Sequence, residues 1–324
     1  FHKYYVPENM AICISGDLDP KETMAVISRE FARWKPGSKQ IEKLKWLEKP
    51  LQGREFVQVK YQSEEQVLLA FRTVARNHED FPAVRLVDMI LDNSVAGLIN
   101  LNLVEAQAVR GAGSYPQNMN DHGVQYLFGI PKDGQTLDEV EALLLKQVDM
   151  VKKGEFADWI LPAVINDFKK RRKQDEEENT KRVELLRDTF LAFRDWNDTA
   201  NEIDKLEAVT KQQVVSAANK YFGENFVAGH RIDAQHDLPK IDKPKIDPLD
   251  INASRASAFM EDLEKMKVDP FAPKYLEPSQ DYEILKIRPG LLLYHSKNPV
   301  NDLFALHFRV ETGARQDPLL PIAK

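Results

Sequence analysis

The sequence lacks several features that mark particular classes of protein. Its only cysteine, Cys13, excludes an internal disulfide and a zinc site built from thiolates, and it leaves the redox compartment undecided. No apolar run approaches the roughly 18 residues that a membrane-spanning helix requires. With 14 glycines and 18 prolines among 324 residues, the chain is neither fibrous nor of low complexity. These absences leave an ordinary globular protein, and the length predicts about two domains.

The charge balance argues against nucleic acid as the partner. The 45 lysines and arginines are outnumbered by 51 aspartates and glutamates, which gives a net charge of −6 and repels phosphates. The basic run Lys169–Lys173 is followed at once by the acidic run Glu176–Glu178, so opposite charges lie four residues apart. The spacing predicts a solvated helix face with four such pairs: Arg171 with Asp175, Arg172 with Glu176, Glu177 with Lys181, and Glu178 with Arg182.

The first residues predict a strand followed by a helix. Met10–Ser15 is a short apolar run before a glycine, which is typical of a buried strand and would make the Cys13 thiol inert. Asp19 and Pro20 are the residue types of a helix N-cap and a first helical position. Apolar residues then recur at helical spacing as far as Trp34, so we expect this helix to pack on the strand.

Residues 51–233 carry the pattern of one complete α/β unit. Alternation over Glu55–Tyr61 and the apolar run Gln66–Arg72 predict a hairpin. Thr136 and Thr210 each precede a glutamate or glutamine by three residues, which is the capping-box signature of a helix start. Further predicted elements are a helix capped at Asp80 and continued over Val95–Glu105, a largely helical stretch over Ala157–Phe222, and strands over Val124–Ile130 and Phe226–Ile232.

The composition changes after this unit. Six of the 18 prolines fall within residues 234–281. Because proline removes a backbone donor and fixes φ, this stretch is predicted to be an extended linker, interrupted by one helix over Ser254–Met266. Residues 282–324 then contain three strand candidates: Tyr282–Ile287, Leu291–His295 and Leu303–Val310.

Two pairs of segments resemble each other in the same order along the chain. The sequence Lys3–Ala11 is similar to Lys220–Val227, and Val67–Arg72 is similar to Phe304–Arg309. The alternative is that helix–strand joints and hairpins use similar residues in any α/β protein. If these segments are an internal repeat, the chain is predicted to be a piece of a longer polypeptide. It would then contain three parts: the C-terminal end of one unit (1–36), a complete second unit (51–233) and the first strands of a third (282–324).

The histidines give no strong sign of a metal site. None of the seven lies four residues from another, as a helical zinc motif requires. Asn77–Asp80 indicates a loop and helix cap, because adjacent side chains point in different directions, and His307 is predicted to be a half-buried residue of a strand. A candidate set of metal ligands lies at the end of the unit: His230, Asp233, His236 and Asp237. The neighbouring prolines favour an exposed linker there instead.

Other catalytic patterns are also missing. The sequence has no G-x-S-x-G elbow, no P-loop and no G-x-G-x-x-G, and Gly111-Ala-Gly113 is weak evidence for a phosphate site. Carboxylates are plentiful, but the sequence places no pair as acid and base. We therefore predict no catalytic, metal-binding or substrate-binding residue in this chain.

One segment resembles a known family. Tyr4–Pro20 contains Y-x-P-x-N-M, an apolar run and G-D-x-D-P, and it looks like the end of the zinc domain of insulinase-like (pitrilysin-type) metallopeptidases. Leu291–Lys324 is similar to the opening strands of a third such domain. Three segments between them resemble the homologous second domain: Leu68–Arg72, Leu98–Gly113 and Leu206–Tyr221.

The resemblance implies both a fold and a function. It implies α/β (α+β) domains, each a mostly antiparallel sheet with helices packed on one face. It also implies a zinc endopeptidase that encloses peptides in a chamber, with an H-x-x-E-H helix that would precede Phe1. Zinc is then expected in the full-length parent and not in this chain. The implied partners are peptide substrates and other domains of the same polypeptide, and the implied location is the bacterial periplasm or envelope.

A second family motif bears on the role of this unit. The domain that clamps substrate carries arginine and tyrosine in the pattern L-R-x-x-E-x-x-x-Y. Aligned on Glu105, these positions hold Asn102 and Val109, with Arg110 one position beyond, so the resemblance implies a wall and scaffold domain. One alternative is a catalytically inactive homologue that acts as a scaffold or core subunit of a complex. Another is an unrelated α/β binding protein.

Overall fold

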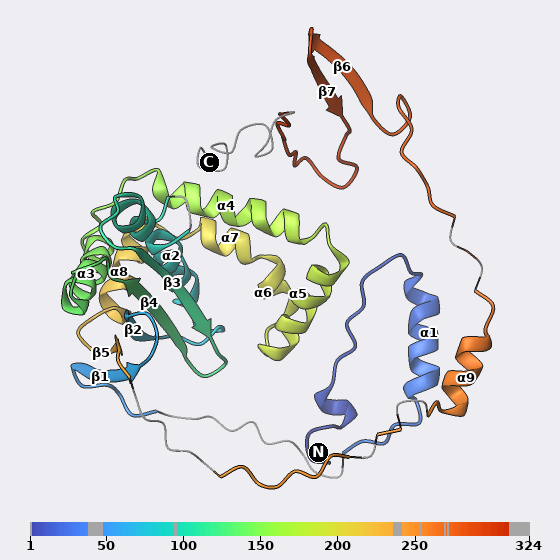
Figure 1. The fold of residues 1–324 in the computed structure, drawn as a ribbon, viewed down its shortest axis with the longest axis horizontal. Helices are drawn as coiled ribbons and strands as arrows, with labels where there is room; N and C mark the ends of the chain where they lie inside the picture. The colour runs from blue at the N-terminus through green and yellow to red at the C-terminus, as the bar shows by residue number, and fades with distance from the viewer. Residues whose placement is uncertain are drawn as a thin grey trace. The chain divides into compact units, whose positions relative to one another are not determined.

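The computed structural model describes residues 2–37, 48–93, 96–235, 242–249, 251–252, 255–268, 270 and 272–310. The chain divides into two compact units, Phe1–His236 and Asp237–Lys324 (Figure 1). The first unit holds a five-stranded sheet and most of the helices, and the second holds one helix and a two-stranded sheet. No helix in the described ranges is long and apolar enough to cross a membrane.

The five-stranded sheet has the order β1-β5-β2-β4-β3. All neighbouring strands are antiparallel except β1 and β5, which are parallel. The prediction of a mostly antiparallel sheet is therefore confirmed. The strands are β1 (Arg54–Tyr61), β2 (Gln66–Thr73), β3 (Gly111–Asn118), β4 (Gly123–Ile130) and β5 (Phe226–Asp233).

The predicted hairpin between the first two strands is wrong. Strand β5 lies between β1 and β2, so that Arg54 is opposite Phe226 on one side and Gln66 is opposite Arg231 on the other. The local pattern identified both strands but could not reveal a partner that follows far along the chain. All eight residues of β1 are exposed, as expected of an edge strand, whereas β2 is central and buries every second residue.

Helices cover one face of the sheet, as predicted. Helix α2 (Phe81–Leu91) contacts β3, α3 (Leu137–Lys153) contacts β2 and β4, and α8 (Lys211–Tyr221) contacts β2 (Figure 1). The fully buried ring of Phe71 on β2 stacks on Phe226, with ring centroids 5.0 Å apart. Each such buried side chain contributes about 2 kcal/mol, and Phe71→Ala would cost about 3 to 5 kcal/mol with the cavity it leaves.

The two predicted capping boxes are confirmed. The Thr136 hydroxyl accepts from the Glu139 N–H at 3.2 Å, while the Glu139 carboxylate accepts from the Thr136 N–H at 2.8 Å. Thr210 and Gln213 form the same arrangement at the start of α8. Gly154 ends α3 with φ 70°, a left-handed conformation that favours glycine.

The stretch between α3 and α8 is helical, as predicted, but it breaks after α4. Of the predicted charge pairs, Arg172 contacts Glu176 at 2.5 Å, whereas Arg171 contacts Asp167 instead of Asp175. Helix α4 ends at Asp175, before Glu177, so Glu177 and Lys181 do not share one helix as predicted. Lys181 contacts Glu184. The helices here are α4 (Ile160–Asp175), α5 (Asn179–Leu191), α6 (Trp196–Ala200) and α7 (Glu202–Glu207).

The helix predicted to continue α2 is present in a distorted form. Residues 98–99 are α-helical and Asn100–Glu105 form a π-helix, which we label η2. The sequence pattern breaks at Gly111, but this residue instead begins strand β3, which was not predicted. An ideal Cβ on Gly113 would lie 2.8 Å from both a carboxylate oxygen of Asp92 and the ring of Phe128. Glycine is thus required here by close approach, and not by a phosphate-binding loop.

The predicted N-terminal strand is wrong. A short 3₁₀ helix, η1 (Pro7–Asn9), precedes residues 10–15, which form no strand and have exposed side chains at Met10, Ile12 and Ile14. Helix α1 (Pro20–Phe31) is confirmed, and the Asp19 carboxylate accepts from the first N–H groups of the helix at 2.8 and 2.9 Å. No residue of α1 is buried, so its expected packing on a strand is also wrong. With no ladder partner in the described part of the chain, the apolar run cannot form a sheet.

The second unit is sparse in regular structure. Helix α9 (Ala258–Lys265) starts at the Ser257 cap, later than predicted, and β6 (Glu283–Arg288) pairs antiparallel with β7 (Leu291–His295), as expected. The third strand candidate, Leu303–Val310, forms no strand. His307 within it is exposed rather than half-buried, because residues 303–310 have no strand partner that the structure describes.

Candidate functional site

Among the described histidines of this unit, His230 is the buried one, and its partners come from a helix rather than from the linker. Its side chain is 4% exposed, and Nε2 lies 2.8 Å from a carboxylate oxygen of Glu141 on α3. Asp233, expected nearby, is exposed at the end of β5, and His236 and Asp237 lie outside the described residues. The predicted four-residue set is therefore not assembled in the described structure.

Glu141 is the centre of a buried ion-pair network. Arg54 on β1 donates to both of its carboxylate oxygens, at 2.7 and 2.8 Å, and the rings of Phe56 and His230 meet edge to face at 4.9 Å. Burial alone would raise the pKa of Glu141, but hydrogen bonds from Arg54 and His230 outweigh it and hold the pKa below its ordinary value. Glu141 was not predicted from the sequence, although it shares a helical face with buried Leu144 and Val148.

The same cluster is the one place in the described structure where three metal-type ligands converge. Atoms of Asp138, Glu141 and His230 lie within 4.8 Å of one another, so this cluster is the candidate site for the zinc of the resembled family. It does not fit. Both oxygens of Glu141 accept from the Arg54 guanidinium, whose charge repels a cation, and Asp138 is 89% exposed.

The loop at Asn77–Asp80 lies between strand β2 and helix α2. The Asp80 side chain does not cap α2, contrary to prediction; its Oδ2 accepts from Lys220 Nζ at 2.7 Å and from the Tyr221 hydroxyl at 2.5 Å. The hydrogen bond from Lys220, and then that from Tyr221, lowers the pKa of Asp80. His78 Nδ1 accepts from the Asp80 N–H at 3.0 Å. These contacts hold the loop against α8.

A second carboxyl group that sequence analysis missed lies between α2 and the sheet. Asp88 Oδ1 accepts from the Ser114 hydroxyl at 2.8 Å and from the side-chain amide of buried Gln125 at 2.5 Å. Burial raises the pKa of Asp88 to about 6, although both hydrogen bonds lower it, and nearby Asp92 raises it further. A polar residue at a core-facing helical position was the available signal.

The positions aligned with the substrate clamp have structural contacts. The Asn102 side-chain amide donates to the Gln147 side chain at 2.8 Å, and Val109 is buried. Arg110, beside the tyrosine position, pairs with Glu64. In this arrangement neither aligned position offers a phenol or a guanidinium to a ligand.

Comparison with known proteins identifies the family. Residues 1–168 match the family described as the peptidase M16 inactive domain, which is about half of the 324 residues. The chain therefore belongs to this family, and the predicted relationship to insulinase-like peptidases is confirmed. No curated protein sequence matches the chain.

Solved structures show the same fold. A protease from Helicobacter pylori is 18% identical, with a TM-score of 0.67 over 71% of this chain and 57% of that one. A peptidase M16 inactive domain from Pseudomonas fluorescens is 15% identical, with a TM-score of 0.57 over 69% of this chain and 54% of that one. The first half of the periplasmic protease PqqL from Escherichia coli is 16% identical, with a TM-score of 0.54 over 68% and 50%. This chain thus spans about half the length of these relatives.

Proposed function

We propose that this chain is a non-catalytic part of a zinc metalloendopeptidase that degrades peptides within an enclosed chamber. The observation that supports the proposal is the match to an inactive peptidase domain in a sequence that holds no H-x-x-E-H. In this proposal the chain has four parts: the end of a zinc domain (1–36), a complete non-catalytic domain (51–233), a linker (234–281) and the first strands of a third domain (282–324).

Hydrolysis would depend on chemistry supplied by another domain. Zinc in such enzymes polarises a water molecule and the peptide carbonyl, and a neighbouring carboxylate removes the proton. Here Glu141 is bound by Arg54 and His230, and Asp80 is bound by Lys220 and Tyr221. Carboxylates engaged in this way hold elements of the fold together and are poor general bases, because their charge is already neutralised.

The sheet supports a role as a wall. Its second face carries the side chains that alternate with the buried ones on β2, and the exposed Val57 and Tyr61 on β1. Tyr115 and Tyr126, a directly paired couple on β3 and β4, stack there with centroids 5.1 Å apart. An extended, partly apolar sheet face of this kind can line an enclosure or contact another domain.

A peptidase assay tests the proposal. The 324-residue chain is incubated with internally quenched peptides, with added zinc or with a chelator, and we expect no cleavage above buffer. Chelator-sensitive cleavage by this chain alone would contradict a non-catalytic role. A larger protein that joins this chain to an H-x-x-E-H domain should cleave, and should lose cleavage with chelator. Failure of that protein to cleave would favour the alternative, a scaffold subunit of a complex.

A further inference from the structure

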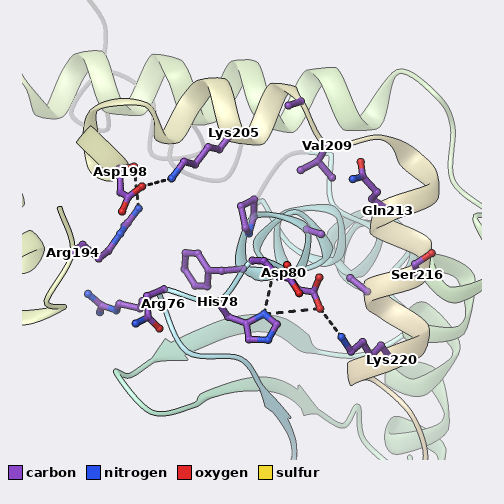
Figure 2. A pocket seen from close by; sticks show the side chains of 17 residues that line it. Arg76, His78, Asp80, Arg194, Asp198, Lys205, Val209, Gln213, Ser216 and Lys220 are labelled. Carbon is purple, nitrogen blue, oxygen red and sulfur yellow. Dashed lines mark hydrogen bonds and ion pairs between the residues drawn. The ribbon is translucent and has the colours of Figure 1, made fainter. Parts of the chain in front are cut away.

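A cavity of about 660 Å³ lies beside the helices, on a part of the unit distinct from the Glu141 network. Figure 2 shows it between the loop at 76–80 and helices α6, α7 and α8. This volume lies within the range of small-molecule and side-chain binding sites. Apolar groups form much of the lining: Phe81, Pro82, Ala83, Ala208, Val209 and Ala217.

The acidic groups of the rim are largely neutralised. Asp80 accepts from Lys220 at 2.7 Å, and Asp198 accepts from Lys205 at 2.5 Å. Glu79, on the exposed loop, is the third acidic lining residue. Four cationic side chains therefore face three acidic ones: Arg76, Arg194, Lys205 and Lys220 against Glu79, Asp80 and Asp198.

The two arginines carry the excess positive charge. Arg76 donates through Nε to the Asn118 carbonyl at 2.9 Å, and the described residues place no carboxylate in an ion pair with it. Arg194 lies 3.4 Å from Glu202, a carboxylate that also pairs with Arg85 at 2.7 Å. Because one carboxylate serves more than one guanidinium, the positive charge of Arg194 is only partly compensated.

The neutral polar groups of the lining supply donors. The Gln213 carbonyl oxygen is used in the capping box, where it accepts from Thr210, and this leaves the NH₂ group to face other partners. His78 Nδ1 accepts from the Asp80 N–H, so the neutral ring carries its proton on Nε2. The lining of the cavity thus combines apolar side chains, a surplus of cationic charge and hydrogen-bond donors.

We propose that this cavity binds a carboxylate that bears an apolar group, of the kind found at the C-terminus of a peptide with an apolar last residue or in a small aromatic acid. The carboxylate would contact Arg76 and Arg194, since guanidinium groups bind carboxylates in a two-pronged geometry. The apolar group would contact Phe81 and Val209. Binding by the chain itself does not depend on the proposed peptidase role.

Fluorescence anisotropy tests the proposal on the complete chain at low salt. The probe is a fluorescein-labelled Gly-Gly-Phe peptide with a free C-terminal carboxylate, and its comparison is the same peptide with a C-terminal amide. We expect the free acid to bind at least ten times more tightly than the amide. Equal affinity for the two peptides, or no binding of either peptide or small acid, would overturn the proposal.

Variants locate the site. Arg76→Gln should weaken binding of the free acid at least tenfold, while Arg29→Gln on exposed α1 should leave it unchanged. Val209→Glu places a negative charge in the cavity without removing an ion pair, and it should abolish binding in a chain whose circular dichroism is unaltered. Full affinity in both cavity variants would overturn the proposal.

A competition arm separates the two sources of the ligand. Displacement of the peptide by 3-phenylpropionate, with no displacement by 3-phenylpropanamide, would confirm carboxylate recognition. If 3-phenylpropionate binds in a direct titration and the peptide acid does not, the cavity takes small acids. The reverse result assigns it to peptide ends.

Discussion

The guanidinium of Arg54 donates to both carboxylate oxygens of Glu141, at 2.7 and 2.8 Å, and so joins edge strand β1 to helix α3. The Glu141 side chain is only 8% exposed, and it is also hydrogen-bonded to His230 on the neighbouring strand β5. Since β1 pairs with a single strand and its residues are all exposed, this contact is a main link between β1 and the helical layer.

Loss of Arg54 should destabilise the fold. Arg54→Met leaves a buried carboxylate with a histidine as its remaining close partner, and we expect the free energy of unfolding to fall by about 2 kcal/mol. Urea denaturation followed by circular dichroism measures the change. Arg29→Met, which removes an exposed pair with Glu30, is the control and should change stability by about 0.5 kcal/mol or less. Equal denaturation midpoints for the two variants would show that the Glu141 network contributes little.

Asp88 should make the stability depend on pH. Its pKa is about 6 in the folded chain and near 3.8 when unfolded, so the folded state binds more protons between these values. Stability due to this group is fully present below about pH 4 and is lost as the pH rises to about 6, a difference of about 3 kcal/mol. The negative charge of Asp92 raises the pKa of Asp88, and the positive charge of Arg85 lowers it.

The variant Asp88→Asn removes this pH dependence. The amide oxygen can still accept from Ser114 and Gln125, since both donate to the same oxygen of Asp88. We expect Asp88→Asn to raise the free energy of unfolding by about 1 to 2 kcal/mol at pH 7.5 and to change it little at pH 4, as measured by urea denaturation. Asp121→Asn, in an exposed loop, should have the same small effect at both pH values. A lower stability of Asp88→Asn at pH 7.5 would contradict the assignment.

Local patterns predicted most helices of this chain, and distant pairings escaped prediction. The capping boxes at Thr136 and Thr210 are set by residues three positions apart, so the sequence alone could locate them. The place of β5 between β1 and β2 depends on residues far along the chain, and so does the meeting of Arg54 with Glu141. A periodic apolar run identified strand candidates, but Leu303–Val310 forms no strand because strand formation also requires a partner.

Zinc should not bind to this chain at one equivalent. The cluster of Asp138, Glu141 and His230 has ligand-type atoms, but the Arg54 guanidinium occupies both oxygens of Glu141. After dialysis against micromolar zinc, elemental analysis should find well below one zinc ion per chain. Arg54→Ala releases the carboxylate and should increase zinc uptake, whereas Arg29→Ala should not. One equivalent of zinc in the unmodified chain would contradict the non-catalytic assignment.

Gly113 should be intolerant of any side chain, because the backbone of β3 lies against two bulky groups. A Cβ at this position would stand 2.8 Å from a carboxylate oxygen of Asp92 and 2.8 Å from the Phe128 ring, distances that force a shift of both. We expect Gly113→Ala to lower the free energy of unfolding by about 1 to 3 kcal/mol, measured by urea denaturation. Gly223→Ala is the matched control, since nothing lies within 4 Å of its Cβ. Equal stability of the two variants would mean that the close approach at Gly113 is relieved at little cost.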